Sequence, residues 1–278
     1  MIDETIHLKN APGEYFSLLA DAIDKFLHLN LLVGLLRHCT LPQKNAPEEY
    51  VRILRVTPKT RLILASNSPR RRELLNLGGW EYDIRPAQVE ETPRQREKPA
   101  GYVGRLAQEK ARACARSAHP GETIIAADTT VVLDGDILGK PADEQEAAAM
   151  LRRLRGRTHQ VCTGIVVLDV DTSACIPDLC VTSVPMRDYT EEELLAYAAS
   201  GDPLDKAGAY AIQHPVFHPV DSLHGCYASV MGLPLCHLER SLEKVGIHPV
   251  SDLPAACQAA LKYECPIHAR VRNGEEVG

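Results

Sequence analysis

Short strand patterns alternate with helical patterns from about residue 60 to residue 247, and this alternation constrains the fold more than any other feature. Strands are predicted at 61–65, 123–127, within 160–169, within 179–187 and at 208–212. Helices are predicted at 69–77, 99–117, 143–154, 190–199 and 235–245. The Asp134-Gly135 pair within TVVLDGDIL also predicts a hairpin turn. Alternation mixed with a hairpin indicates an α/β protein with a mixed sheet.

The alternating segment lies between two regions with different patterns. Apolar residues at helical spacing near the N-terminus predict that residues 1–58 form a helical extension. The main domain is therefore expected to span residues 59–247. The remaining residues, 248–278, are expected to form a tail with one short helix at 253–263.

Charge and hydropathy limit the partners of the chain. The formal net charge of −6 argues against a surface that binds nucleic acid, so any cationic site must be local. The N-terminus lacks the basic start of a signal peptide, and the apolar stretch FLHLNLLVGLL is too short to span a bilayer. Nine cysteines form no C-x-x-C pair, which favours reduced thiols. We therefore expect a cytoplasmic protein with no membrane or nucleic-acid partner.

Three consecutive arginines, 70–72, lie at the start of a predicted helix, where the helix dipole favours acidic residues. Ser68 is a suitable N-cap, and Pro69 fits the first helical position. Guanidinium groups beside the unpaired N–H groups of a helix start match the oxygens of a phosphate. The alternative is that the three side chains point into solvent. No G-x-G-x-x-G follows the first strand, and GDILGKP departs from a P-loop, which argues against dehydrogenase and P-loop classes.

Further charged residues lie where a phosphate or a metal could be held. Asp128 ends the apolar run TIIAA, and a carboxylate there must be solvated, paired or bound to a metal. Glu90 and Glu91 place two more carboxylates on a loop, and carboxylates from different segments suit magnesium. Lys140 lies in a Gly-Pro loop from which an ammonium can reach a phosphate. In isolation, a turn aspartate and a surface lysine are the simpler interpretations.

Eight short segments follow one another along the sequence: SNSPRRRELL (66–75), VEE (89–91), LAQEKARA (106–113), AADTTVVLDG (126–135), LGKP (138–141), LRRLRGRTHQVCTG (151–164), DKAGAYAIQ (205–213) and VMGLP (230–234). Together they resemble the Maf family, the septum-formation proteins that act as nucleoside triphosphate pyrophosphatases. The resemblance covers about residues 60–247. It implies the Maf/ITPase-like α/β fold, in which helices flank a mixed, curved sheet in two lobes with a central cleft. It also implies a homodimer.

The resemblance implies hydrolysis of a nucleoside triphosphate to the monophosphate and pyrophosphate, with a divalent cation, Mg²⁺ or Mn²⁺. It further implies a role in cleansing the nucleotide pool, with a link to arrest of cell division. By the same resemblance, Asp128 accepts the proton of the attacking water and shares the metal with Glu91. Lys110 and Lys140 are the other catalytic residues that it implies. The substrate-binding residues that it implies are Ser66, Arg70, Arg71, Thr129, Gln213 and Lys206, which closes the site.

The base preference follows from the same comparison. Arg70, Thr129 and Gln213 match the pattern of family members that hydrolyse dTTP and UTP. A glutamine amide can pair with the O4 and N3–H edge of uracil or thymine. His214-Pro215 replaces a usual glycine after Gln213, which predicts a shifted preference. Two alternatives stay open: an inosine/xanthosine-type NTP pyrophosphatase, and a nucleotide-binding regulator of division without catalysis.

Overall fold

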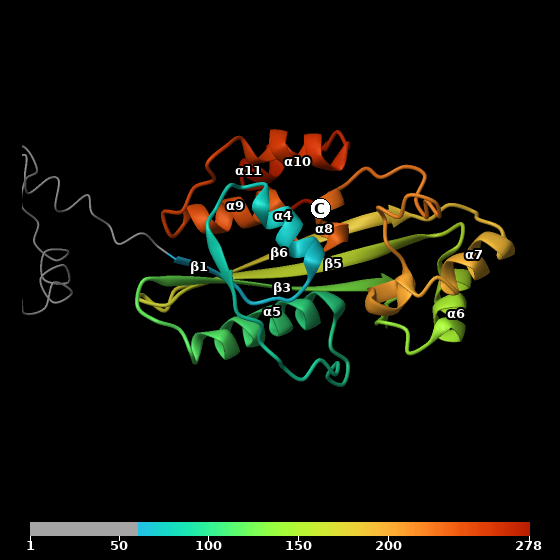
Figure 1. Ribbon diagram of the computed structural model, residues 1–278, viewed down its shortest axis with the longest axis horizontal. Helices are drawn as coiled ribbons and strands as arrows, with labels where there is room; N and C mark the ends of the chain where they lie inside the picture. Colours follow the sequence, from blue (N-terminus) through green and yellow to red (C-terminus); the bar gives the residue numbers. More distant parts are fainter. Residues whose placement is uncertain (1–60) are drawn as a thin grey trace, which may run out of the picture. The chain divides into compact units, whose positions relative to one another are not determined.

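The computed structural model describes residues 61–278, so the predicted extension at 1–58 lies outside the described residues. The strands are β1 (Arg61–Leu64), β2 (Tyr82–Ile84), β3 (Glu122–Leu133), β4 (Asp136–Leu138), β5 (Thr158–Asp169) and β6 (Cys175–Pro185). The helices are α4 (Pro69–Asn76), α5 (Pro99–Ala115), α6 (Glu144–Leu154), α7 (Glu191–Ala198), α8 (Tyr227–Met231), α9 (Leu235–Glu243), α10 (Leu253–Leu261) and α11 (His268–Arg272). The predicted mixed α/β sheet is confirmed, with the strand order β2-β1-β3-β5-β6 and β4 paired to β3 (Figure 1).

The long strand β3 organises the sheet. Along one edge it pairs antiparallel with β5, where Asp128 lies opposite Gly164. Its other edge pairs in parallel with β1 as far as Ile125 and then antiparallel with β4 from Val131 onward. Residues 126–130 therefore have no strand partner on that edge. The gap between the ends of β1 and β4 leaves room for a ligand, because loops at strand ends diverge there.

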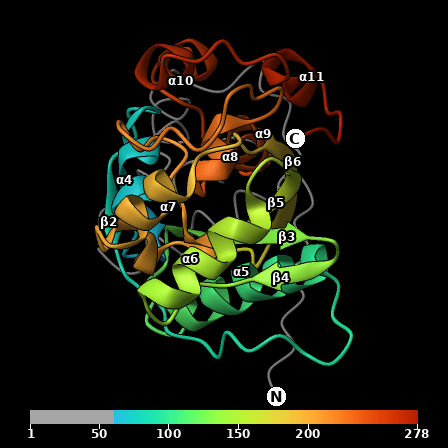
Figure 2. The same cartoon turned by 90° about the vertical axis from the view of Figure 1, so that its right-hand side faces the viewer.

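Helices cover both faces of this sheet. The helix α5 packs against β3 and β5 on one face, whereas α8 and α9 pack against β5 and β6 on the other (Figures 1 and 2). The helices α10 and α11 lie over α9. Gly164 allows the close approach of α5, since a Cβ atom at this position would lie 2.8 Å from the backbone of Val103. Lys110, on the same helix, is thereby held close to β3.

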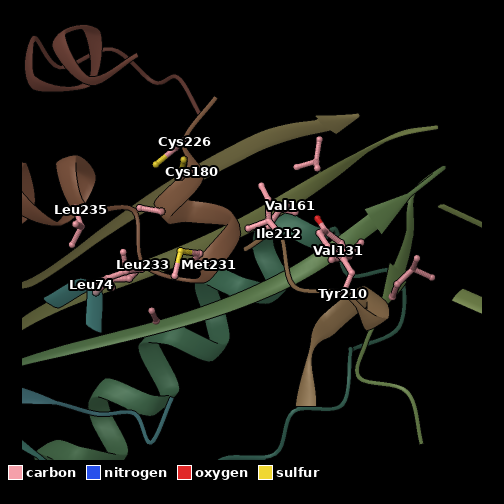
Figure 3. Close-up of a cluster of buried hydrophobic side chains, with 14 of the residues drawn as sticks. Leu74, Val131, Val161, Cys180, Tyr210, Ile212, Cys226, Met231, Leu233 and Leu235 are labelled. Carbon is pink, nitrogen blue, oxygen red and sulfur yellow. The ribbon is translucent and has the colours of Figure 1, made fainter. Parts of the chain in front are cut away.

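The largest core fixes the two short helices that border the gap in the sheet. Leu74 of α4 packs with Met231 of α8 and with Leu233, all of them buried (Figure 3). Val131 of β3 belongs to the same core. Burial of each such side chain contributes about 1.5–3 kcal/mol, so α4 and α8 are held firmly beside β3.

The strand predicted at 208–212 is wrong. Residues Ala207–Ala209 form the 3₁₀ turn η3, which follows a second such turn, η2 (Asp202–Asp205). Gly208 has φ 70°, in the left-handed region, and a Cβ atom there would lie 2.7 Å from Val131. The N–H of Ala211 donates to the hydroxyl of Tyr197 at 2.9 Å instead of to a strand. Close packing of the glycine against β3 therefore overrides the apolar pattern of AGAYAI.

Three elements had no clear signal in the sequence: β2, α8 and α11. The expectation of one short helix in the tail is wrong, because residues 248–278 form two helices, α10 and α11. Val271 of α11 is buried. Arg240 of α9 donates to the carbonyl oxygens of Val271 and Glu275, which joins the tail to the rest of the fold. None of the helices in residues 61–278 is both long and apolar enough to cross a membrane.

Candidate active site

A cavity of about 960 Å³ opens beside the unpaired stretch of β3. All ten residues to which the family resemblance gives a role line it: Ser66, Arg70, Arg71, Glu91, Lys110, Asp128, Thr129, Lys140, Lys206 and Gln213. Arg72 and Glu90, which the sequence also offered for a phosphate and a metal, do not line it. These residues come from α4, α5 and β3 and from the loops between the elements. The fold therefore brings the predicted residues to one place, and the role of each residue stays a prediction.

The first turn of α4 begins as the sequence predicts. The side chain of Ser68 accepts a hydrogen bond from the backbone N–H of Arg71, and Pro69 occupies the first helical position. The first turn contains no acidic residue. The positive end of the helix dipole and the arginines therefore lie together at the cavity, an arrangement that favours an anion.

Arg71 is held by three hydrogen bonds from its guanidinium group. Its Nε donates to the carbonyl oxygen of Gly232 at 2.8 Å, Nη1 to Oγ of Ser66 at 3.3 Å, and Nη2 to Oγ1 of Thr129 at 3.2 Å. Burial lowers the pKa of Arg71, and the charge of Asp128 offsets part of this effect. Gly232 has φ 109° at the C-cap of α8, a conformation that favours glycine. The result is a cation of fixed orientation at the cavity wall.

Lys110 lies between two carboxylates. Its Nζ is 2.6 Å from Oδ1 of Asp128 and 2.7 Å from Oε1 of Glu91. Burial raises the pKa of Asp128, and the charges of Lys110 and Arg71 offset only part of the rise. Burial also disfavours ionised Glu91, but the hydrogen bond and charge of Lys110, together with the charges of Lys140 and Arg71, outweigh it, so the pKa of Glu91 is lowered. Of the two acids, Asp128 is the one suited to accept a proton.

The other cations of the cavity differ in how many N–H donors remain free. The Nζ of Lys206 donates to the carbonyl oxygen of Asp202 at 2.5 Å, to Oδ1 of Asp202 at 3.0 Å and to Oδ1 of Asp205 at 2.6 Å. These three bonds use all the hydrogens of the ammonium group. Arg70 has a looser contact, with Nη1 3.7 Å from Oδ2 of Asp205. Lys140 has no hydrogen bond or ion pair within residues 61–278, so all three of its donors are available.

Gln213 lies on the wall formed by the segment after η3. Its side chain is exposed and has no hydrogen bond to the described part of the chain. Tyr210, on the same segment, is buried, and its hydroxyl lies 2.8 Å from Nε2 of His159. Burial lowers the pKa of His159 to about 4, so this ring is neutral at pH 7. The contact between Tyr210 and His159 holds the segment against β5, and the amide of Gln213 is free to pair with a ligand.

Several residues of the site were missed by the sequence analysis. The hydroxyl of Tyr102 donates to the backbone oxygen of Glu91 at 2.7 Å and fixes that loop. Asp205 contacts both Arg70 and Lys206. A carboxylate directly before a lysine was a readable signal for Asp205. No comparable signal marked Tyr102, because its role depends on how the loop folds back on α5.

The described residues could bind a metal ion through a pair of carboxylates. Within residues 61–278, no group of three or more His, Cys, Asp or Glu side chains could hold a metal ion. Glu91 and Asp128 present hard oxygen donors on either side of Lys110. Two carboxylates suffice for magnesium when waters and substrate phosphates complete its coordination.

The chain is similar to known proteins over about two thirds of its length. The family model described as Maf-like protein matches residues 61–245. The dTTP/UTP pyrophosphatase of Geobacter sulfurreducens is 44% identical over 188 residues, which cover 68% of this chain and 98% of that protein. The protein of the same name from Myxococcus xanthus is 46% identical over 189 residues, covering 68% and 94% of the two chains. The solved structure of the Staphylococcus aureus Ham1 protein shares 15% identity with this chain at a TM-score of 0.40, over 77% of this chain and 100% of that one. By the family model and these relatives, the chain belongs to the Maf family.

Proposed function

We propose that this chain is a nucleoside triphosphate pyrophosphatase that hydrolyses dTTP and UTP to the monophosphate and pyrophosphate. The main support is the arrangement in one cavity of a desolvated acid, Asp128, and cations with free N–H donors. The names of relatives at about 44% identity support the substrates.

Asp128 acts as the general base for the attacking water. Its carboxylate accepts the proton while the water oxygen bonds to the α-phosphorus and the bond to the β-phosphate oxygen breaks. A base works best when its pKa lies near the working pH, and burial moves Asp128 in that direction. Lys110, 2.6 Å away, orients the carboxylate and stabilises its ionised form before the proton arrives.

We infer the position of the triphosphate from the free donors of the cavity. Negative charge moves onto the leaving pyrophosphate, and pre-placed cations stabilise it. Arg71, Arg70 and Lys140 all have N–H groups that no carboxylate occupies by a hydrogen bond. We assign these three residues to the phosphates, with Lys140 at the leaving group. Lys206 reaches a phosphate only if it releases Asp202 or Asp205, which matches a residue that closes the site after binding.

A divalent cation, Mg²⁺ or Mn²⁺, fits the two carboxylates of this cavity. Glu91 stays ionised and Asp128 lies across Lys110 from it, so these two residues would hold the ion. When bound, it would supply positive charge to the phosphate oxygens. Lys110 would then lose one of its two carboxylate contacts to the ion.

Gln213 supplies the contact to the base. Its amide presents both a donor and an acceptor, which can match O4 and N3–H of uracil or thymine. Cytosine reverses this pattern, with an amino donor and a ring acceptor. A free amide can rotate to match either pattern, so the preference for dTTP and UTP over CTP rests on the names of the relatives.

Two further features are proposed on the resemblance: that the cavity lies between two lobes, and that the chain forms a homodimer. From the spacing of apolar residues we also propose that residues 1–58 form a helical extension. Analytical ultracentrifugation of the full chain tests the homodimer, and circular dichroism of the full chain and of a form that lacks residues 1–58 tests the extension.

Release of pyrophosphate tests the proposed function directly. The full chain is assayed with dTTP, UTP, CTP, GTP, 7-methyl-GTP and ITP, with and without magnesium. We expect dTTP and UTP to give the highest kcat/KM, and activity to require the metal. Preference for ITP would favour the inosine/xanthosine type, and tight nucleotide binding without turnover would favour a regulator.

A further inference from the structure

Three hydrogen bonds link Arg71 to the backbone of α8 through two hydroxyl groups. Nη2 of Arg71 lies 3.2 Å from Oγ1 of Thr129. This oxygen lies 3.0 Å from Oγ1 of Thr163, which in turn donates to the carbonyl oxygen of Ser229 at 2.9 Å. Thr129 and Thr163 are direct neighbours in the β3–β5 ladder.

The donor and the acceptor of each of these three hydrogen bonds are fixed. A carbonyl oxygen can only accept, so the hydrogen of Thr163 points to Ser229. Thr163 must then accept from Thr129, whose own hydrogen is used in that bond. Thr129 is left as an acceptor for Arg71, which can only donate. The result is one ordered series of donors from the guanidinium to α8.

This order restricts what Thr129 can do in the cavity. An ionised phosphate oxygen accepts hydrogen bonds and has no hydrogen to give. The only hydrogen of the Thr129 hydroxyl is already donated to Thr163. The hydroxyl of Thr129 therefore presents only lone pairs to a phosphate and cannot donate a hydrogen bond to it. Its favourable contact on this wall is with Arg71.

Thr163 itself has no access to a ligand. It is fully buried, and it does not belong to the lining of the cavity. The same helix, α8, ends at Gly232, whose carbonyl oxygen accepts from Nε of Arg71 at 2.8 Å. The guanidinium is thus tied to α8 twice, directly at Gly232 and through the two threonines at Ser229.

We infer that Thr163 is a positioning residue that fixes the orientation of Arg71 through the hydroxyl of Thr129. The inference rests on the proposed function, because it assigns Arg71 to the phosphates. Removing the hydroxyl of Thr163 leaves the hydrogen of Thr129 without an acceptor. Thr129 can then rotate, and Nη2 of Arg71 loses a fixed partner.

The test is a double-mutant cycle on the full chain with dTTP and magnesium. We expect Thr163→Val to lower kcat by about 10- to 100-fold with KM changed little, as for a small displacement of a group that acts in the transition state. Thr163→Ser, which keeps the hydroxyl, restores kcat to near the original value. In the Arg71→Ala background, Thr163→Val has almost no further effect, because its target is gone.

The matched control is Thr123→Val. Thr123 is also fully buried on the sheet, and its hydroxyl has no hydrogen-bond partner, so its loss leaves kcat unchanged. If Thr163→Val does not fold, Thr129→Val breaks the same series of bonds and is tested in the same cycle. Additive losses in the cycle, or a kcat for Thr163→Val equal to that of the original chain, overturn the inference. If the original chain releases no pyrophosphate from any nucleotide, it is the proposed function that fails.

Discussion

Lys110 places its ammonium 2.6 Å from Oδ1 of Asp128, so the charge of the lysine acts directly on the acid that we assign as the base. Burial raises the pKa of Asp128 and Lys110 lowers it. Removing the positive charge therefore raises the pKa further. Because only the ionised base is active, the acid limb of the pH–rate profile moves to higher pH.

We expect Lys110→Met to shift the acid limb of kcat/KM for dTTP upward by about 1–3 pH units, the usual effect of an adjacent opposite charge. Lys110→Arg keeps the positive charge, so its acid limb should move by less than about half of the shift seen for Lys110→Met. The measurement is pyrophosphate release between pH 5 and 9 for the three proteins. An unchanged limb in Lys110→Met, whatever its overall rate, contradicts the assignment of Asp128.

Asp128→Asn removes the proton acceptor and keeps the size of the side chain. General-base catalysis contributes about 10²- to 10⁴-fold, so we expect kcat to fall by that factor. Asp136→Asn is the matched control, since Asp136 lies on the β4 hairpin, pairs with Arg153 and does not line the cavity. The measurement is the initial rate with saturating dTTP. A kcat for Asp128→Asn within twofold of the original would reject Asp128 as the base.

Glu91 and Glu90 are adjacent, yet only Glu91 lines the cavity. Glu90 instead accepts from the backbone N–H of Thr92. Glu91→Gln should raise the magnesium concentration for half-maximal activity by roughly tenfold or more. Losing a residue that only hydrogen-bonds to a metal ligand already lowers metal affinity by about 10- to 100-fold. Glu90→Gln should leave that concentration unchanged. Equal effects of the two substitutions, measured by magnesium titration of pyrophosphate release, would show that Glu91 does not hold the ion.

Two lysines that line the cavity, Lys140 and Lys206, should behave differently. Lys140 has free donors, so Lys140→Met removes a group that meets developing charge, which typically costs about 100- to 1000-fold in kcat. The donors of Lys206 are used by Asp202 and Asp205, so Lys206→Met should mainly raise KM and lower the melting temperature. Steady-state kinetics and thermal unfolding of both variants separate these effects. A larger loss of kcat for Lys206→Met than for Lys140→Met would reverse the assignment.

The local structure could be predicted from the sequence more accurately than the contacts between segments. The start of α4 was predictable, because Ser68 and Pro69 act through the backbone of their own helix. The 3₁₀ turn at Gly208 was not, because it depends on the distance to Val131 on another element. Motif residues could be identified, but the role of Thr163, which lies within the motif at 151–164, could not be predicted, because its partner follows only from the β3–β5 register.

Gly164 provides the last test, because it links the packing of α5 to the geometry of Lys110. A Cβ atom at Gly164 would lie 2.8 Å from the backbone of Val103 and 2.9 Å from that of Gly104, so Gly164→Ala must push α5 from the sheet. We expect it to lower the free energy of unfolding by about 1–3 kcal/mol and to reduce kcat/KM, since Lys110 moves with the helix.

Gly104→Ala is its matched control on the other side of the same contact. A Cβ atom at Gly104 would meet nothing within 4 Å, and alanine in place of glycine stabilises a helix interior by about 1 kcal/mol. Urea unfolding and dTTP hydrolysis are measured for both variants. The expected result is opposite signs in stability, with activity lost only in Gly164→Ala. Equal stability of the two variants would mean that α5 does not depend on the missing side chain of Gly164 for its distance from β3, and the position of Lys110 would need another explanation.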